Sequence, residues 1–183
     1  MFYMVFIFII VQRVTELFIA RKNEKWMRNR GGIEHGKDHY PYIVSLHILF
    51  LVSFFIEVQV FRRELTEIWF VMFPILFLTQ LLRYWAVFSL GNYWNTKIMI
   101  VPGDVVISRG PYKFVKHPNY IVVAIEILIL PLLFHAYITA ILFTILNVIM
   151  MTIRIPAEES ALQTYTNYHE VFSIRSIFTS KKK

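Results

Sequence analysis

Two short polar segments of this sequence carry residue types that could bind a small molecule. The first is His117-Pro118-Asn119-Tyr120, which lies directly before the apolar run IVVAIEILIL, and the second is Arg154-Ile155-Pro156-Ala157-Glu158-Glu159. Proline is favoured at the first position of a helix, so the two segments predict helix starts at Pro118 and at Pro156. The backbone N–H groups of a helix start favour an anionic ligand group, which makes the 117–120 turn a candidate binding site.

The carboxylates of Glu158 and Glu159 fall in the first turn of the second predicted helix, where the helix dipole favours negative charge. Taken alone, they are most simply a solvated helix start. On a helix, Glu158, Leu162, Tyr165 and His169 share one face. This stripe of carboxylate, apolar, phenol and imidazole side chains either lines a pocket or lies on the membrane surface.

The composition is that of a membrane protein. Hydrophobic residues make up 57% of the 183 residues and the mean hydropathy is +0.54, whereas soluble domains are roughly 45–50% apolar. The length predicts a single domain over residues 1–183. Cysteine is absent, which excludes disulfides, thiolate metal sites and a cysteine nucleophile.

Apolar runs of about 17–25 residues predict membrane-spanning helices. The sequence predicts an all-α integral membrane bundle of about five spans, with a cytoplasmic C-terminal helix from Pro156. The N-terminal helices occupy residues 1–88, and residues 89–183 form a long loop, a helical hairpin divided near Pro131, and the last helix. The expected spans cover 2–20, 41–61, 68–88, 121–135 and 136–153.

The basic residues predict the orientation in the membrane. Fifteen Lys or Arg fall in 21–40, 89–120 and 154–183, whereas the other side receives only Arg62 and Arg63. Since Lys and Arg concentrate on the cytoplasmic side, the long loops and the C-terminus are expected to face the cytoplasm, with the cell membrane as the expected location. This spread through loops argues against nucleic-acid binding and for contact with anionic membrane lipid.

Five charged residues fall within the predicted spans, where an unpaired charge is costly. Arg13 and Glu16 are three residues apart and are expected to pair. Glu126 has no charged neighbour in sequence and is expected to point into the bundle, toward Arg83, Arg154 or a ligand. A buried ion pair that fixes helix packing and a functional role both remain open for Glu126. The five residues are Arg13, Glu16, Glu57, Arg83 and Glu126.

The loop after the first span contains Glu34-His35 and Asp38-His39, a spacing that could hold a metal ion. Gly31-Gly32 and Gly36 argue against the helix that such a spacing requires. A loop cap, or a lid over the entrance for a substrate, is therefore favoured over a metal site.

The 109–120 stretch RGPYKFVKHPNY, followed by a hairpin with an intramembrane Glu and by Arg154 with Glu158-Glu159, resembles the isoprenylcysteine carboxyl methyltransferase family of membrane enzymes. The resemblance runs from about Arg83 to Phe172 and includes Leu90-Gly91 and Trp94. It departs from the family after Leu162, where Thr166-Asn167 replaces a Gly-containing turn before paired tyrosines. The short N-terminal half indicates a small bacterial-type member.

The resemblance implies a pocket for S-adenosylmethionine that opens sideways to lipid. By position, His117, Pro118 and Tyr120 would line the cofactor site, and the C-terminal segment would close it. Arg154, Glu159 and His117 would carry catalysis, with Arg154 positioning the acceptor and His117 or His169 serving as base for a hydroxyl acceptor. The closing residues would be Glu158, Glu159, Leu162 and Tyr165, and no metal is implied.

The function implied is therefore an S-adenosylmethionine-dependent O-methyltransferase that acts on the carboxyl or hydroxyl oxygen of a lipophilic or lipidated acceptor. Two other functions remain open. Sterol-reductase-like membrane enzymes share a similar hairpin and H-P-x-Y region but use NADPH, and the short N-terminal half disfavours them. The other alternative is a lipid-binding membrane protein without catalysis.

Overall fold

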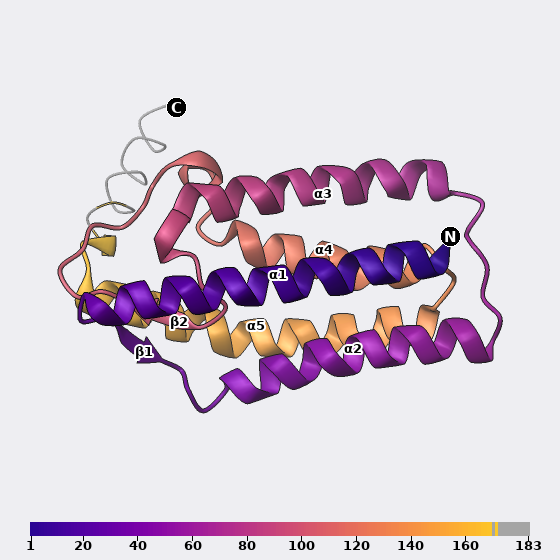
Figure 1. Cartoon of the computed structure of the whole chain (residues 1–183), viewed down its shortest axis with the longest axis horizontal. Helices are drawn as coiled ribbons and strands as arrows, with labels where there is room; N and C mark the ends of the chain where they lie inside the picture. Colours follow the sequence, from indigo (N-terminus) through magenta and orange to yellow (C-terminus); the bar gives the residue numbers. More distant parts are fainter. Residues whose placement is uncertain (170, 172–183) are drawn as a thin grey trace, which may run out of the picture.

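Five helices run alternately up and down along one direction in the computed structural model, which describes residues 1–169 and 171 (Figure 1). This arrangement confirms the predicted all-α membrane bundle. The helices are α1 (Phe2–Asn29), α2 (Tyr40–Val60), α3 (Trp69–Leu90), α4 (Pro118–Leu132) and α5 (Tyr137–Tyr165).

Four of the helices, α1, α2, α3 and α5, are long and apolar enough to cross a membrane, and α4 is a shorter apolar helix of 15 residues. Their outward faces expose large apolar side chains, among them Phe8, Phe77 and Ile141, of which Phe77 is 64% exposed. Water would solvate such a surface poorly, whereas lipid chains match it. The outward apolar faces therefore support an integral membrane protein.

Two helices extend beyond their predicted ends. Helix α1 continues to Asn29, well past residue 20, and α5 runs without interruption through Pro156 to Tyr165. The prediction of a separate helix that begins at Pro156 is therefore wrong. Proline removes one backbone donor but is tolerated inside a helix whose neighbours hold it. Here Ala157 and Ala161, just beyond the proline, pack against a strand and keep the helix continuous.

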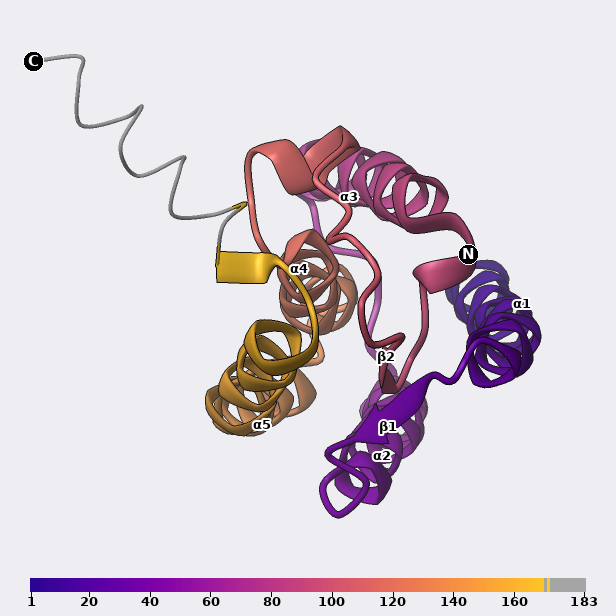
Figure 2. The same cartoon turned by 90° about the vertical axis from the view of Figure 1, so that its left-hand side faces the viewer.

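A small antiparallel strand pair, which the sequence did not predict, closes one end of the bundle (Figure 2). Strand β1 (Ile33–His35) pairs with β2 (Ile98–Ile100), with His35 opposite Ile98. Gly31 and Gly36, which bracket β1, both have positive φ angles and so turn the chain into and out of the strand. The pair joins the α1–α2 connection to the long loop, which also contains the 3-10 helices η1 (Gly91–Tyr93) and η2 (Gly110–Lys113). We call this end of the bundle the strand end.

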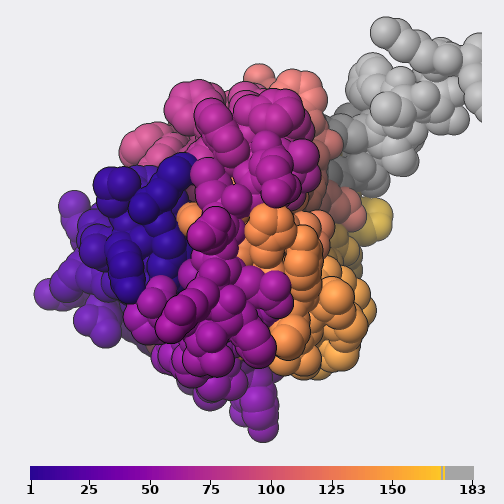
Figure 3. Space-filling model, turned by 90° about the vertical axis from the view of Figure 1, so that its right-hand side faces the viewer, coloured from indigo at the N-terminus to yellow at the C-terminus, as the bar shows by residue number. Residues whose placement is uncertain are grey.

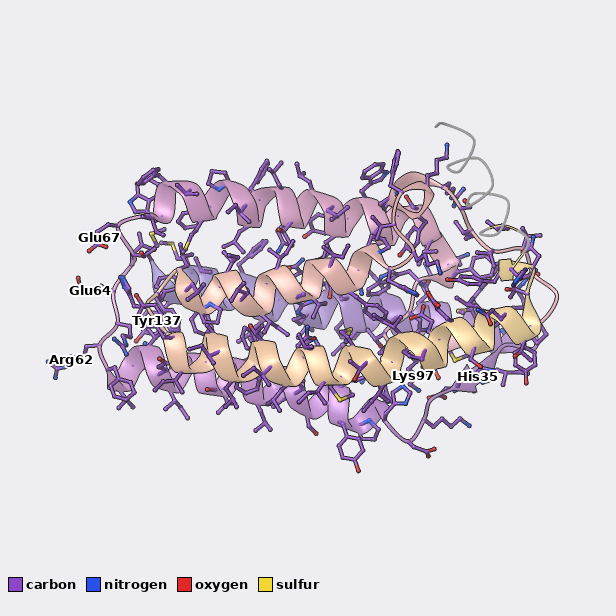
Figure 4. All side chains as sticks on the ribbon, turned by 180° about the vertical axis from the view of Figure 1, so that it is seen from behind. His35, Arg62, Glu64, Glu67, Lys97 and Tyr137 are labelled. Atoms are coloured by element: carbon purple, nitrogen blue, oxygen red, sulfur yellow. The ribbon has the colours of Figure 1, made fainter. Side chains whose placement is uncertain are left out.

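The opposite end, formed by residues 61–68 and 133–136 and called here the hairpin end, is packed with aromatic rings. The ring of Phe2 meets those of Phe54 and Phe134 edge-on, at centroid distances of 5.3 and 5.2 Å. Viewed from this end, α1, the α2–α3 connection and the α4–α5 turn lie side by side (Figure 3). Arg62, Glu64 and Glu67 lie at this end, far from His35 and Lys97 at the strand end (Figure 4).

Four charged side chains, two from α1 and one each from α3 and α4, form one network. The Arg13 guanidinium pairs with Glu16 at 2.8 Å, and Arg83 pairs with Glu16 at 2.7 Å. Glu126 accepts from the Arg83 Nε at 3.1 Å and from Gln80 at 2.7 Å, and it also pairs with Arg13. The predicted Arg13–Glu16 pair and the inward direction of Glu126 toward Arg83 are thus confirmed. Arg154 belongs to a different cluster, described below.

Glu57, the fifth intramembrane charge, caps a helix other than its own. Its carboxylate accepts from the backbone N–H of Ile138 at 3.1 Å and of Thr139 at 2.7 Å. The Thr139 hydroxyl donates to it at 2.7 Å. The start of α5 therefore receives its hydrogen-bond acceptors from α2, which ties the hairpin end together.

Candidate functional site

The two polar segments of the sequence meet at the strand end, where the start of α4 lies beside the last turns of α5 (Figure 2). Helix α4 begins at Pro118 with His117 as its N-cap, so the first predicted helix start is confirmed. The preceding turn is fixed by Gly110, whose φ of 59° and close approach to Ser89 exclude a side chain. Arg109 beside it donates from its Nε to the Ser89 carbonyl at 2.7 Å.

Glu159 receives several donors at one carboxylate oxygen. His117 Nε2 lies 3.1 Å from Glu159 Oε1, the Tyr168 hydroxyl donates to the same oxygen at 3.1 Å, and Lys116 Nζ does so at 3.3 Å. A carboxylate only accepts, so the proton of a neutral His117 is on Nε2 and its Nδ1 is an acceptor. The start of α4 and the end of α5 are therefore in direct polar contact.

Glu158, Tyr120 and Arg154 form a second chain of contacts beside the first. The Tyr120 hydroxyl donates to Glu158 and accepts from Arg154 Nε at 3.0 Å. Arg154, which is 6% exposed, also donates to the Thr96 carbonyl at 2.6 Å. The Tyr120 ring stacks on that of His117 with centroids 5.3 Å apart, so the two chains form one cluster.

Two phenols outside the spans stay protonated beside these carboxylates. Burial, together with the charge of Glu158, raises the pKa of the Tyr112 phenol. Burial and the charge and hydrogen bond of Glu159 likewise raise the pKa of Tyr168. Both phenols therefore stay neutral over the physiological pH range, and Tyr168 donates to Glu159.

The predicted site residues separate into two groups. One group makes the polar cluster, whereas Leu162 and Tyr165 pack beside Ile98 and Ile100 of β2. The Tyr165 ring also lies 5.0 Å from that of His35 on β1. His169 is exposed, and Phe172 lies outside the described residues. The polar cluster contains His117, Pro118, Tyr120, Arg154, Glu158 and Glu159.

Glu34 of the loop after α1 forms salt bridges with Arg28 and, at 3.4 Å, with Lys97. These contacts connect α1, β1 and the loop before β2. Within residues 1–169 and 171 there is no group of three or more His, Asp or Glu side chains that could hold a metal ion. Through its two salt bridges, Glu34 connects the strand pair to α1.

Some contacts at the site were not predicted from the sequence. The Thr96 carbonyl, which accepts from Arg154, is a backbone group and no residue type signals it. Lys116 stands next to His117 in the RGPYKFVKHPNY stretch, and this position could have indicated that Lys116 contacts the site.

His39 also lies near this region. Burial and the charge of Arg154 lower the pKa of its imidazole, and its Nε2 is buried without a partner among the described residues.

The polar cluster fits the groups of S-adenosylmethionine. Glu158 and Glu159 carry carboxylate oxygens that can accept from an ammonium group, and Tyr120 and His117 are aromatic groups of the kind that a sulfonium contacts. Asn119 Oδ1, in the same turn, is a buried acceptor without a partner in the described part of the chain and so suits a hydroxyl or amine donor.

A sequence model of the isoprenylcysteine carboxyl methyltransferase (ICMT) family matches residues 70–164. The uncharacterized protein YpbQ of Bacillus subtilis (strain 168) is 46% identical over 166 residues, which cover 91% of this chain and 99% of that protein. An uncharacterized protein of Haemophilus influenzae is 26% identical over 155 residues, 84% of this chain and 90% of that protein. No solved structure matches the chain.

Proposed function

This chain belongs to the isoprenylcysteine carboxyl methyltransferase family, a family of membrane methyltransferases, and we propose that it transfers a methyl group from S-adenosylmethionine to a carboxyl or hydroxyl oxygen of a lipophilic acceptor. The observation that carries the proposal is the polar cluster in which His117 and Glu159 lie 3.1 Å apart. The cluster lies at the strand end, where polar loops meet the apolar helices. Such a boundary suits a reaction between a charged methyl donor and an apolar acceptor.

In this proposal Glu159 and Glu158 bind the ammonium group of the cofactor, and Asn119 Oδ1 accepts from one of its hydroxyl or amine groups. When bound, S-adenosylmethionine would supply a sulfonium methyl group for an O–C bond to the acceptor, with the C–S bond broken and S-adenosylhomocysteine as the leaving group. The faces of Tyr120 and His117 stabilise positive charge. Leu162 and Tyr165 hold the strand pair over the cluster and so exclude water.

Arg154 is placed to position the acceptor oxygen, because its guanidinium is fixed by Tyr120 on one side and by Thr96 on the other. A carboxylate acceptor needs no base. A hydroxyl acceptor needs one, and His117 Nδ1 is the acceptor atom that remains when Nε2 donates to Glu159. Positioning of the reactants accounts for most of the rate, up to roughly 7–11 kcal/mol of the barrier.

We further propose that the strand end faces the cytoplasm, where S-adenosylmethionine is made available to the site. Basic residues support this orientation, since among the described residues the segments 21–40, 89–120 and 154–169 carry eleven Lys or Arg, whereas the connection at the hairpin end carries Arg62 and Arg63.

The test is cofactor binding by detergent-purified protein. Calorimetric titration with S-adenosylhomocysteine, the demethylated product, is expected to give saturable binding, whereas NADPH gives none. Incubation with S-adenosylmethionine labelled in its methyl group and a bacterial membrane lipid extract is then expected to label a solvent-extractable product. Binding of NADPH in place of the sulfonium cofactor would support the sterol-reductase-like function, and binding of neither would support a non-catalytic lipid-binding protein.

A further inference from the structure

The outward face of α1 carries a stripe of exposed residues that changes from apolar to basic along the helix. Helix α1 lies at the outside of the bundle (Figure 2), and its buried residues, among them Glu16 and Met27, face the other helices. Residues of the stripe recur every three or four positions, so they share the opposite face of the helix. They are Val11, Val14, Phe18, Arg21, Lys25 and Arg28, and all of them are exposed.

The change from apolar to basic falls where α1 leaves the hydrocarbon core of a membrane. Val14 and Phe18 are 45% and 64% exposed and face lipid. A helix rises about 1.5 Å per residue, so about 20 residues cross a core roughly 30 Å thick. Helix α1 has 28 residues, and its apolar part ends at Ala20. Arg21 and Lys25 therefore lie at the level of the lipid phosphates, next to lipid-facing apolar side chains.

Arg21 and Lys25 carry positive charges that no carboxylate of the described chain neutralises. Among residues 1–169 and 171, neither side chain takes part in a salt bridge. Glu24, the acidic residue nearest to them in sequence, is paired instead with Arg28 at 2.6 Å and with Lys97 at 3.0 Å. The two unpaired cations are therefore available to an anionic group from outside the chain.

An open hollow of about 280 Å³ lies between these side chains. Arg21, Lys25 and Arg28 line it, together with Glu24 and Asn29. Residues four positions apart on a helix have Cβ atoms about 5–6 Å apart, so one phosphate group can accept from Arg21 and Lys25 at the same time. Because the hollow opens outward, it suits a headgroup whose chains continue along the helix.

Each part of the stripe favours a different part of such a ligand. The apolar part packs against hydrocarbon chains, which a soluble anion or a water-soluble protein lacks. The basic part favours a headgroup with a net negative charge, since the trimethylammonium group of phosphatidylcholine would be repelled by the same cations. An anionic phospholipid meets both conditions.

We propose that this stripe binds one anionic phospholipid, with its phosphate between Arg21 and Lys25 and its acyl chains along Val14 and Phe18. The site is separate from the polar cluster and does not depend on the proposed methyl transfer. It lies on α1, which precedes residues 70–164, the part of the chain that matches the family.

The bound lipid is expected to stabilise the strand end through α1. Asn23, on the buried side of the same helical turns, donates to the carbonyls of Gly91 at 3.1 Å and Trp94 at 2.7 Å. These hydrogen bonds join α1 to the loop that contains Thr96, whose carbonyl holds Arg154. Since a ligand that binds only the folded protein stabilises it, the lipid should raise the melting temperature.

The test compares a double variant of the stripe with a control that loses the same charge elsewhere. Arg21→Gln/Lys25→Gln removes the two unpaired cations, whereas Lys37→Gln/Arg62→Gln removes two exposed cations away from the stripe. Each purified protein, in detergent, is mixed with phosphatidylglycerol or with phosphatidylcholine of the same acyl chains. Native mass spectrometry gives the affinity for the first bound lipid. Melting temperatures are measured with and without lipid, and the values without lipid show whether each variant is folded.

Phosphatidylglycerol should bind the wild type and the control more tightly than phosphatidylcholine does, and it should raise their melting temperatures. The stripe variant should bind phosphatidylglycerol about tenfold to thirtyfold more weakly, with phosphatidylcholine binding unchanged. Lys25→Gln alone, a single exposed change, should give a loss of roughly threefold to fivefold. Phe18→Ala should weaken binding of both lipids, because it removes apolar contact with the acyl chains.

Equal losses in the stripe variant and the control would show that any surface cation attracts the lipid, and would overturn the proposal. Equal affinities of the wild type for the two lipids would also overturn it. Inorganic phosphate and hexaglutamate are the remaining probes. Stabilisation by either of them equal to that by phosphatidylglycerol would assign Arg21 and Lys25 to a soluble anion or an acidic protein, against the proposal.

Discussion

Arg83 of α3 and Glu126 of α4 form an ion pair whose side chains are 1% and 2% exposed, at the centre of the network that joins α1, α3 and α4. Arg13 and Glu16 complete this network with one charge of each sign. Because the charges cancel, the network holds three helices in register without a net charge in the membrane.

Replacing Arg83 alone should strongly destabilise the protein. Arg83→Met leaves two carboxylates with one guanidinium, and loss of one partner of a buried pair costs about 3–5 kcal/mol. The double variant Arg83→Met/Glu126→Met leaves the Arg13–Glu16 pair balanced and should regain most of the lost stability. Thermal unfolding in detergent measures both. Destabilisation of the double variant by the sum of the two single effects would contradict the balanced network.

Glu159→Gln should weaken binding of S-adenosylhomocysteine by about tenfold to a hundredfold, the usual effect of losing a hydrogen bond to a charged group. The amide keeps the shape of the side chain but loses the charge that faces His117 and Lys116. Glu67→Gln, an exposed change at the hairpin end, is the control. Calorimetric titration gives both affinities, and equal affinities would remove Glu159 from the binding site.

Glu57→Ala should lower stability by about 1–3 kcal/mol, because the buried N–H of Thr139 and the part-buried N–H of Ile138 lose their acceptor. Cofactor binding should be unchanged, since Glu57 lies at the hairpin end. Glu64→Ala, at an exposed position of the neighbouring connection, should have little effect. A fall in cofactor affinity without loss of thermal stability would show that Glu57 has a role other than capping α5.

Gly110→Ala should cost about 1–3 kcal/mol more than Gly103→Ala. Both glycines have positive φ angles, so both variants strain the backbone. Only at Gly110 would the added carbon meet another group, the Ser89 hydroxyl at 1.9 Å, whereas the space at Gly103 is open. Melting temperatures of the two variants isolate the steric part, and equal values would show that the loop before η2 shifts freely.

His39 should make the protein less stable in mild acid. Burial and the charge of Arg154 lower the pKa of the His39 imidazole below its usual value of about 6.5. The unfolded chain then binds more protons than the folded protein as the pH falls through this range, so the free energy of unfolding decreases below about pH 6.5. His39→Gln should reduce the loss of stability between pH 7.5 and 5.5, and an unchanged pH dependence would argue against the lowered pKa.

Several parts of the fold could be predicted because they depend on neighbours in sequence. Pro118 marks the start of α4, since proline suits the first helical position. Arg13 and Glu16 pair because three residues separate them on one helix. Prediction from neighbouring residues failed at Pro156, because packing against β2 keeps α5 continuous. It also failed at β1 and β2, because these three-residue strands are stable only as a pair.

The sequence by itself determined that this is an α-helical membrane protein, the approximate position of most of its helices, and which polar residues stand at the start of α4 and in the last turns of α5. Only the tertiary structure decided that Arg154 contacts Tyr120 and Thr96. Glu126 pairs instead with Arg13 and Arg83. Hydropathy and turn residues act over a few helical turns, whereas these contacts join positions far apart in the chain. Such pairings depend on the rotation and depth of each helix in the bundle, which are set by all of the packing contacts together.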